Sequence, residues 1–122
     1  MAKEVERKAM ELVAEYEKKE GRNPQDVSKS KCGYDLKSGK RCIEVKGQSG
    51  PKPEFIYLYK KTLQNLKDDI LNYYIYIVYD IKSSNPKLRI LPPEKIFGNL
   101  EIEPMFLIRA KIFKDLEDIS LK

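Results

Sequence analysis

The run YYIYIVYDI, residues 73–81, constrains the fold of this chain more than any other feature. Its β-branched and aromatic residues, with few polar breaks, are typical of a strand that is buried on both faces. Such a strand lies inside a sheet that is covered on both sides. The sequence therefore predicts an α/β domain built around a mixed β-sheet with flanking helices.

The segments around this strand supply the remaining elements of that fold. Residues 3–20 carry apolar side chains at helical spacing and predict an amphipathic helix. After a polar loop at 22–32, the patterns predict strands at 33–36, 41–46 and 55–59, a helix at 60–71 and a strand at 87–91. The length of 122 residues fits one domain, with a core at about 3–91 and an irregular extension at 92–122 in which MFLIRAKIF reads equally as strand or helix.

Composition narrows the classes of function. The net charge of +5 and the pI of about 9.1 favour an anionic partner, although Lys and Glu are both abundant and much of this charge fits a mixed solvated surface. No run approaches the ~20 apolar residues of a membrane span, and the charged N-terminus does not resemble a signal peptide. We therefore expect a soluble, cytoplasmic protein without a membrane partner.

The absence of histidine also limits the chemistry. It removes the usual general base and leaves carboxylates, Lys, Tyr or a bound metal to carry any catalysis. Cys32 and Cys42 do not form a CxxC pair that could hold zinc. In an intracellular chain they are most often reduced, while a disulfide remains open for a hyperthermophilic source.

The stretch GYDLKSGKRCIEVKG, residues 33–47, reads as a β-hairpin with charges inside its strands. A two-residue turn at Ser38-Gly39 pairs residues whose numbers sum to 77, which sets Asp35 opposite Cys42. Side chains alternate between the two faces of a strand, so Glu44 and Lys46 then share the face of Asp35. Asp35 and Glu44 become diagonal neighbours, ~7–8 Å apart between backbone positions.

The other face of this hairpin is apolar, and it carries Tyr34, Leu36, Ile43 and Val45. The opposite face gathers two carboxylates and one ammonium. Mg²⁺ takes one or two carboxylates together with waters and substrate phosphate, and a neighbouring lysine can stabilise charge that develops at phosphorus. The plain alternative is a one-sided strand whose Glu and Lys are simply solvated.

Asp followed by a strand with Glu-x-Lys resembles the PD-(D/E)XK nuclease superfamily, and so does the order of elements. Residues 5–47, and again YYIYIVYDIKSSNPKLRIL, are similar to the protein NO VEIN C-terminal domain family, which is often appended to helicases or restriction-type proteins. The resemblance implies a restriction-endonuclease-like αβββαβ core, as in Holliday-junction resolvases. It also implies a nuclease that hydrolyses DNA phosphodiester bonds with Mg²⁺ or Mn²⁺, in repair, recombination or restriction.

Site residues follow from the same resemblance. It implies that Asp35 and Glu44 are metal ligands and that Lys46 is the catalytic lysine. Relatives often add an acid from the first helix, for which Glu6 is the match, although a solvated helix glutamate explains Glu6 equally well. The sequence departs from the pattern at Tyr34, where Pro is usual, and at Thr62, where relatives tend to carry an acid.

Basic and aromatic residues suggest how DNA is held. Phosphate contacts or a solvated surface both explain the candidates, which are Lys37, Lys40, Arg41, Lys52 and Gln64, with Lys29 and Lys31 nearby. The tyrosines either stack on bases, as in single-strand binders, or pack in the core. A domain this small implies a homodimer or a helicase-type partner protein. The alternative functions are a catalytically inactive nucleic-acid-binding or adaptor module, and a protein-interaction partner without a nucleic-acid role.

Overall fold

The chain forms a mixed α/β structure around a five-stranded sheet, seen here in a computed structural model that describes residues 2–103, 108 and 110–121. The strands lie in their sequence order, and the parallel pair β3–β4 sits between antiparallel neighbours. They are β1 (Pro24–Asp26), β2 (Leu36–Ser38), β3 (Arg41–Gly47), β4 (Tyr73–Tyr79) and β5 (Lys87–Leu91).

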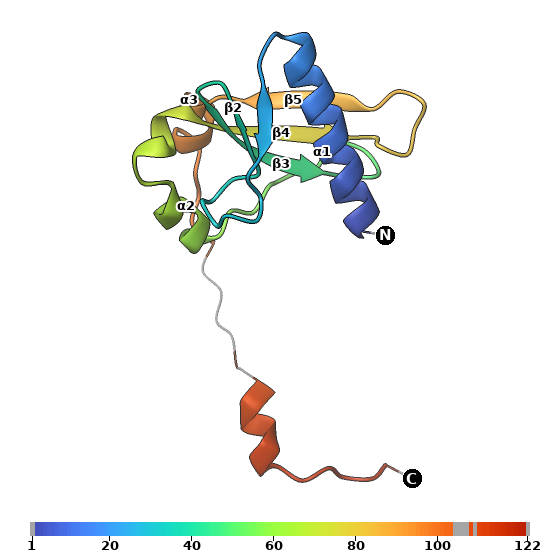
Figure 1. Ribbon diagram of the computed structural model, residues 1–122. Coiled ribbons are helices and arrows are strands. Elements are labelled where there is room, and N and C mark those ends of the chain that lie inside the picture. Colours follow the sequence, from blue (N-terminus) through green and yellow to red (C-terminus); the bar gives the residue numbers. More distant parts are fainter. Residues whose placement is uncertain (1, 104–107, 109, 122) are drawn as a thin grey trace.

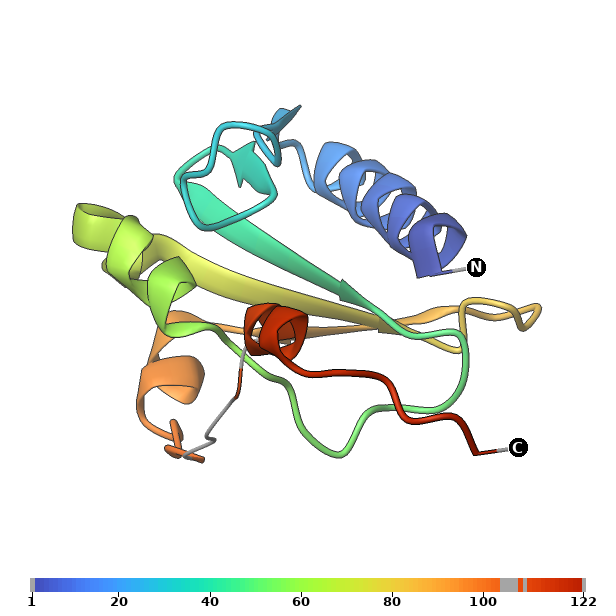
Figure 2. The same ribbon diagram turned by 90° about the horizontal axis from the view of Figure 1, so that it is seen from below.

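Helices cover both faces of this sheet. The helices of the described residues are α1 (Ala2–Lys19), α2 (Lys60–Leu66), α3 (Pro93–Phe97) and the 3₁₀ helices η1 (Lys67–Asn72) and η2 (Ala110–Asp115), of which α1, α2 and α3 cover the sheet. Figure 1 shows α1 crossing the sheet, and Figure 2 shows α2 and α3 on the side opposite α1. Within the described ranges, none of these helices has the length and hydrophobicity that a bilayer crossing needs.

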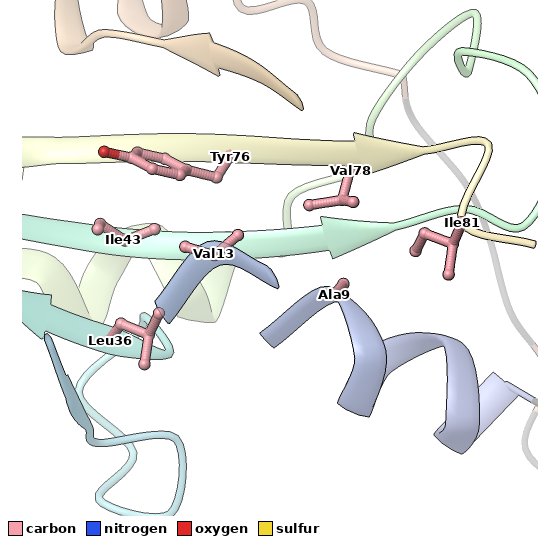
Figure 3. Close-up of a cluster of buried hydrophobic side chains, with 7 residues drawn as sticks. All are labelled: Ala9, Val13, Leu36, Ile43, Tyr76, Val78 and Ile81. Atoms are coloured by element: carbon pink, nitrogen blue, oxygen red, sulfur yellow. The ribbon is translucent and has the colours of Figure 1, made fainter. Parts of the chain in front are cut away.

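The face beneath α1 holds one of the two cores. Its seven buried side chains come from α1, the β2–β3 hairpin, β4 and the turn after β4. They are Ala9, Val13, Leu36, Ile43, Tyr76, Val78 and Ile81 (Figure 3). Gly47 lets the helix approach, because a Cβ there would lie 2.8 Å from the Cβ of Ala9. A larger residue at position 47 would therefore push α1 away from β3.

The opposite face holds the second core, built by α2, α3 and the alternate residues of β4. Its buried side chains are Leu66, Tyr73, Ile75, Ile77 and Ile96. Because residues of both clusters alternate along β4, this strand is buried on both faces, as the run YYIYIVYDI predicts. The prediction of an α/β fold with a mixed sheet is confirmed.

Most elements lie where the periodicity predicts them, but three segments differ. The strand predicted at 33–36 is observed at Leu36–Ser38, so only Leu36 belongs to both. The predicted loop at 22–32 contains the short strand β1, which pairs with β2, whereas the predicted strand at 55–59 makes no ladder. Both edges of β4 are already occupied by β3 and β5. Segment 55–59 lies outside the sheet and packs Ile56 and Leu58 against the second core.

The helix predicted at 60–71 is shorter than expected. It ends at Leu66, and Lys67 takes a left-handed φ of 49° before the chain continues as η1. Near the C-terminus, residues 110–115 are helical. The rest of the MFLIRAKIF segment, apart from Ile108, lies outside the described residues.

A buried ionic network ties α1 to the sheet on the first face. Glu17 is fully buried, and its carboxylate accepts hydrogen bonds from the Arg22 guanidinium at 2.9 Å and from the Tyr76 hydroxyl at 2.7 Å. Arg41 in turn donates to the Tyr76 hydroxyl at 2.7 Å, and its guanidinium lies 4.4 Å from the centre of the Tyr74 ring. Each charge in this network has a partner, as buried charges require.

Candidate metal and nucleic-acid site

The β2–β3 hairpin positions the three charged residues that the sequence singles out. Its observed register pairs Leu36 with Ile43 and Lys37 with Cys42, so the turn is Gly39-Lys40, where Gly39 has a φ of +59°. The predicted turn at Ser38-Gly39 is wrong by one residue and the pairing by two. A shift of two residues leaves every side chain on its predicted face.

In this register Cys42 lies opposite Lys37, so the predicted pairing of Asp35 with Cys42 is not observed. Asp35 lies just before β2, and its N–H donates to the Ile43 carbonyl at 2.8 Å. Its carboxylate oxygen Oδ2 accepts the Val45 N–H at 2.8 Å, which fixes the side chain against β3. The two carboxylates thus lie together on the α2 face of the sheet.

Tyr34 departs from the predicted pattern. The sequence predicts it on the apolar face of Leu36, but it packs against the second core, on the same side as Asp35. Gly33, with a φ of +96°, turns the chain just before the strand, so strict alternation does not extend back to residue 34. The Tyr34 hydroxyl instead donates to an oxygen of Asp69 at 3.3 Å.

Glu44 and Lys46 stand two residues apart on β3 and point to one side. Their charged groups are 3.3 Å apart between Lys46 Nζ and Glu44 Oε2. Only 16% of the Glu44 side chain is exposed, against 34% for Lys46. The structure therefore brings Asp35, Glu44 and Lys46 together, as the hairpin pattern predicts.

The electrostatics of this group favour an additional positive charge. Burial, and next the negative charge of Asp35, raise the pKa of Glu44 to about 7, although Lys46 acts in the opposite direction. Two carboxylates with one ammonium leave a deficit of positive charge in a poorly hydrated place. A cation bound between the carboxylates would relieve it and would favour the ionised form of Glu44.

Tyr73 adds a polar group that sequence reasoning misses. Its side chain is fully buried and its hydroxyl has no hydrogen-bond partner among the described residues. Burial, followed by the negative charges of Glu44 and Asp35, raises its pKa. An unpaired buried hydroxyl beside two carboxylates is a group that a bound water or ion would satisfy. In the sequence, Tyr73 is indistinguishable from the other aromatic residues of its strand.

A cavity of about 560 Å³ opens over the two carboxylates. It lies between the hairpin, the loop before it and α2, and its lining residues are Ser28, Lys31, Gly33, Tyr34, Asp35, Glu44, Tyr59, Lys61, Thr62 and Asn65. Gly33 permits the close contact of loop and helix, since a Cβ there would meet the Thr62 carbonyl oxygen at 2.8 Å. Asn65 also joins them by donating to the Lys31 carbonyl at 3.4 Å.

The second helix contributes polar residues that sequence analysis only partly anticipates. Thr62, where relatives tend to carry an acid, lines the cavity. Asn65 and Lys61 line it too, whereas Gln64 is exposed and does not. The signal for this face was available in the helical spacing of residues 61, 62 and 65, which share one side of the helix, next to the apolar Leu63 and Leu66.

Glu6 stands apart from the carboxylate pair. It is exposed on α1, whose apolar stripe packs on the other face of the sheet, and it does not line the cavity. Its role as an additional acid stays a prediction. Among the residues that the structure describes, no three acidic or thiol side chains are arranged to hold a metal, so the donor set consists of Asp35 and Glu44.

The predicted phosphate-contacting residues are scattered. Lys37 donates to the Cys42 thiol at 3.3 Å, Lys40 is exposed at the hairpin turn, and Lys52 is exposed in the segment after β3. Arg41 is bound to the Tyr76 hydroxyl on the α1 face. The lysines at the cavity itself are Lys31 and Lys61. Both cysteines of the chain are free thiols.

Comparison with known proteins identifies a family whose model covers this site. The model of the family described as Protein NO VEIN, C-terminal, matches residues 5–91, which include both carboxylates, Lys46 and the whole sheet. The chain belongs to this family. Comparison with curated proteins and with solved structures returned no match.

Proposed function

We propose that this protein is a metal-dependent nuclease of the PD-(D/E)XK superfamily, with a restriction-endonuclease-like fold, that hydrolyses phosphodiester bonds in DNA. The observation that carries the proposal is that Asp35 and Glu44 line one cavity, while Lys46, outside the lining, lies 3.3 Å from the Glu44 carboxylate. The element order also supports it, although β1 takes the place of the strand expected at 55–59.

The donor set suits a hard divalent cation. Asp35 and Glu44 supply two carboxylates, and Mg²⁺ or Mn²⁺ takes one or two carboxylates with waters and phosphate oxygens in its remaining positions. When bound, such an ion lowers the pKa of its water and neutralises charge that builds on the phosphate. The unpartnered Tyr73 hydroxyl gives a further polar contact for a water at the base of the site.

The remaining residues of this chain position the substrate. Lys46 carries a positive charge beside Glu44, where it would orient the attacking water and stabilise the equatorial phosphate oxygens. Lys31 and Lys61 line the cavity and would hold neighbouring phosphates. The net charge of +5 favours encounter with DNA. A second copy of the chain or a helicase-type protein would extend this small surface, in repair, recombination or restriction.

Calorimetric titration with Mn²⁺ tests the metal site directly. We expect wild-type protein to release binding heat and Asp35→Ala/Glu44→Gln to release none, with at least a 100-fold loss of affinity. Glu15→Gln, which changes an exposed glutamate of α1, is the matched control and should bind like wild type. Equal heats for wild type and the double variant would remove the metal site.

Cleavage is the second half of the test. Linear, branched and single-stranded DNA should be hydrolysed in Mg²⁺ or Mn²⁺, and Glu44→Gln and Lys46→Ala should each abolish cleavage. Activity that survives both substitutions would contradict the proposal.

A catalytically inactive nucleic-acid-binding module is the second candidate. It is favoured by the donor set of only two acids among the described residues. That function predicts salt-sensitive DNA binding without metal affinity. Glu44→Gln would then leave DNA binding unchanged, or strengthen it by removing a negative charge.

A further inference from the structure

Three aromatic side chains stand in a row on the segment that leads into α2. Phe55, Tyr57 and Tyr59, here the aromatic row, are 64%, 57% and 76% exposed. The residues between them, Ile56 and Leu58, pack against the second core. Because alternate side chains of an extended segment point to opposite sides, this anchoring holds all three rings toward solvent.

The aromatic row contrasts with the other aromatic residues of the described chain. Tyr73 and Tyr76 are fully buried, and burial explains their place in the sequence. Burial does not explain the aromatic row, because its rings are exposed and the contact of an apolar ring with water does not stabilise the fold. Clustered exposed apolar side chains of this kind mark binding surfaces. The rings of Phe55 and Tyr57 also contact each other edge to face, with centroids 5.1 Å apart, which limits their rotation.

The aromatic row runs into the candidate site. Tyr59 at its end lines the cavity together with Asp35 and Glu44. Figure 2 shows the segment between β3 and α2 on the side of the sheet opposite α1. The two carboxylates belong to the same side, because they line the cavity together with residues of α2. Lys31 and Lys61 line the same cavity, so the aromatic surface meets positive charge at the carboxylates.

Aromatic rings beside lysines are suited to bind unpaired nucleotides. Bases offer flat faces that stack on aromatic rings, while lysines contact the phosphates between them. Alternate residues of an extended chain are ~6.6 Å apart, about twice the 3.4 Å rise per base of one DNA strand. In a duplex the bases are already stacked on each other, so their faces cannot reach such a row.

We propose that the aromatic row is a stacking platform that binds single-stranded DNA and directs the strand into the cavity of Asp35 and Glu44. This inference rests on the proposed nuclease function, for which it names the substrate. The preferred substrate is then single-stranded DNA, or the single-stranded part of a branched molecule, and base sequence has little influence because every base has a face to stack.

Binding without metal tests the platform separately from cleavage. Fluorescence anisotropy of a labelled dT12 oligonucleotide, with the full chain in EDTA and low salt, should show binding at least tenfold tighter than to a 12-base-pair duplex or to an abasic strand of equal length. Tyr57→Ala should weaken dT12 binding about tenfold, and Phe55→Ala by a similar factor. Tyr57→Leu should weaken it as much, since an apolar side chain remains but the ring is lost.

Leu71→Ala is the matched control, because Leu71 is a large apolar residue, 82% exposed, that does not line the cavity. It should bind dT12 like wild type. Equal affinity for dT12 and duplex, unchanged affinity in Tyr57→Ala and Tyr57→Leu, or tighter binding of U12 than of dT12 would each overturn the inference. If wild-type protein shows these binding differences but does not cleave DNA in Mn²⁺, the nuclease function is refuted and the stacking platform is still supported.

Discussion

Glu17 and Glu44 lie on opposite faces of the same sheet, and the protein treats their charges differently. Burial raises the pKa of Glu17, but hydrogen bonds from Arg22 and Tyr76 outweigh it and hold that pKa below its ordinary value. Glu44 has Asp35 beside it and only Lys46 in compensation, so its pKa rises to about 7. The comparison separates a carboxylate that stabilises the fold from one that is held ready for a ligand.

The largest expected effect comes from neutralising the two glutamates in turn. Glu17→Gln should lower the free energy of unfolding by about 3 kcal/mol at neutral pH, since it leaves the Arg22 guanidinium without its partner. Glu44→Gln should instead raise it, by about 1 kcal/mol, because a repulsive buried charge is lost. Urea denaturation followed by circular dichroism measures both, and a larger loss for Glu44→Gln would reverse the comparison.

The pH dependence of stability gives the next effect. The folded pKa of Glu44, about 7, lies above its ordinary value of 4.5, so the folded protein binds more protons than the unfolded chain between these values. This contribution to stability is complete below about pH 4.5 and is lost as the pH rises through about 7. We expect the free energy of unfolding to fall by about 3 kcal/mol across that window.

The chain has no histidine to titrate in the same range. Denaturation at about pH 5 and about pH 7.5, in chelator, should therefore show the decline in wild type and a flatter profile in Glu44→Gln. Profiles of equal slope would contradict the assignment of the raised pKa to Glu44.

Substitution of the two buried tyrosines of β4 gives the smallest expected change in stability. It compares the same two faces of the sheet through neutral hydroxyl groups. Tyr76→Phe removes a hydroxyl that donates to Glu17 and accepts from Arg41, so stability should fall by about 2 kcal/mol. Tyr73→Phe removes a hydroxyl without a partner, and stability should rise by about 1 kcal/mol. Thermal unfolding of both variants in chelator decides this, and a loss in Tyr73→Phe would mean that its hydroxyl is satisfied.

Periodicity predicts those elements whose pattern of apolar and polar residues is visible within their own segment. The stripe of α1 and the two-sided burial of β4 follow directly from residue spacing, and both are observed. The charged face of the hairpin also follows, even though the predicted register is off by two, because side chains repeat every two residues along a strand. The prediction therefore depended on turn parity rather than on the turn residue.

Elements that depend on partners distant in the chain were not predictable. Strand β1 forms because it can pair with the edge of β2, and segment 55–59 makes no ladder but packs Ile56 and Leu58 against the second core. Likewise, Glu17 and Arg22 read as ordinary surface charges in a helix and the loop after it. Their burial becomes visible only when Tyr76, 59 residues away in sequence from Glu17, donates to the carboxylate.

The sequence by itself determined that Asp35, Glu44 and Lys46 share one face of a hairpin, since chain geometry alone sets that alternation. The tertiary structure decided how strongly the charged groups on this face are desolvated. The raised pKa of Glu44 requires desolvation, which is supplied by the packed sheet and by α2 closing over Gly33. The exposure of Phe55, Tyr57 and Tyr59 was decided in the same way, because the core accepts only the residues between them.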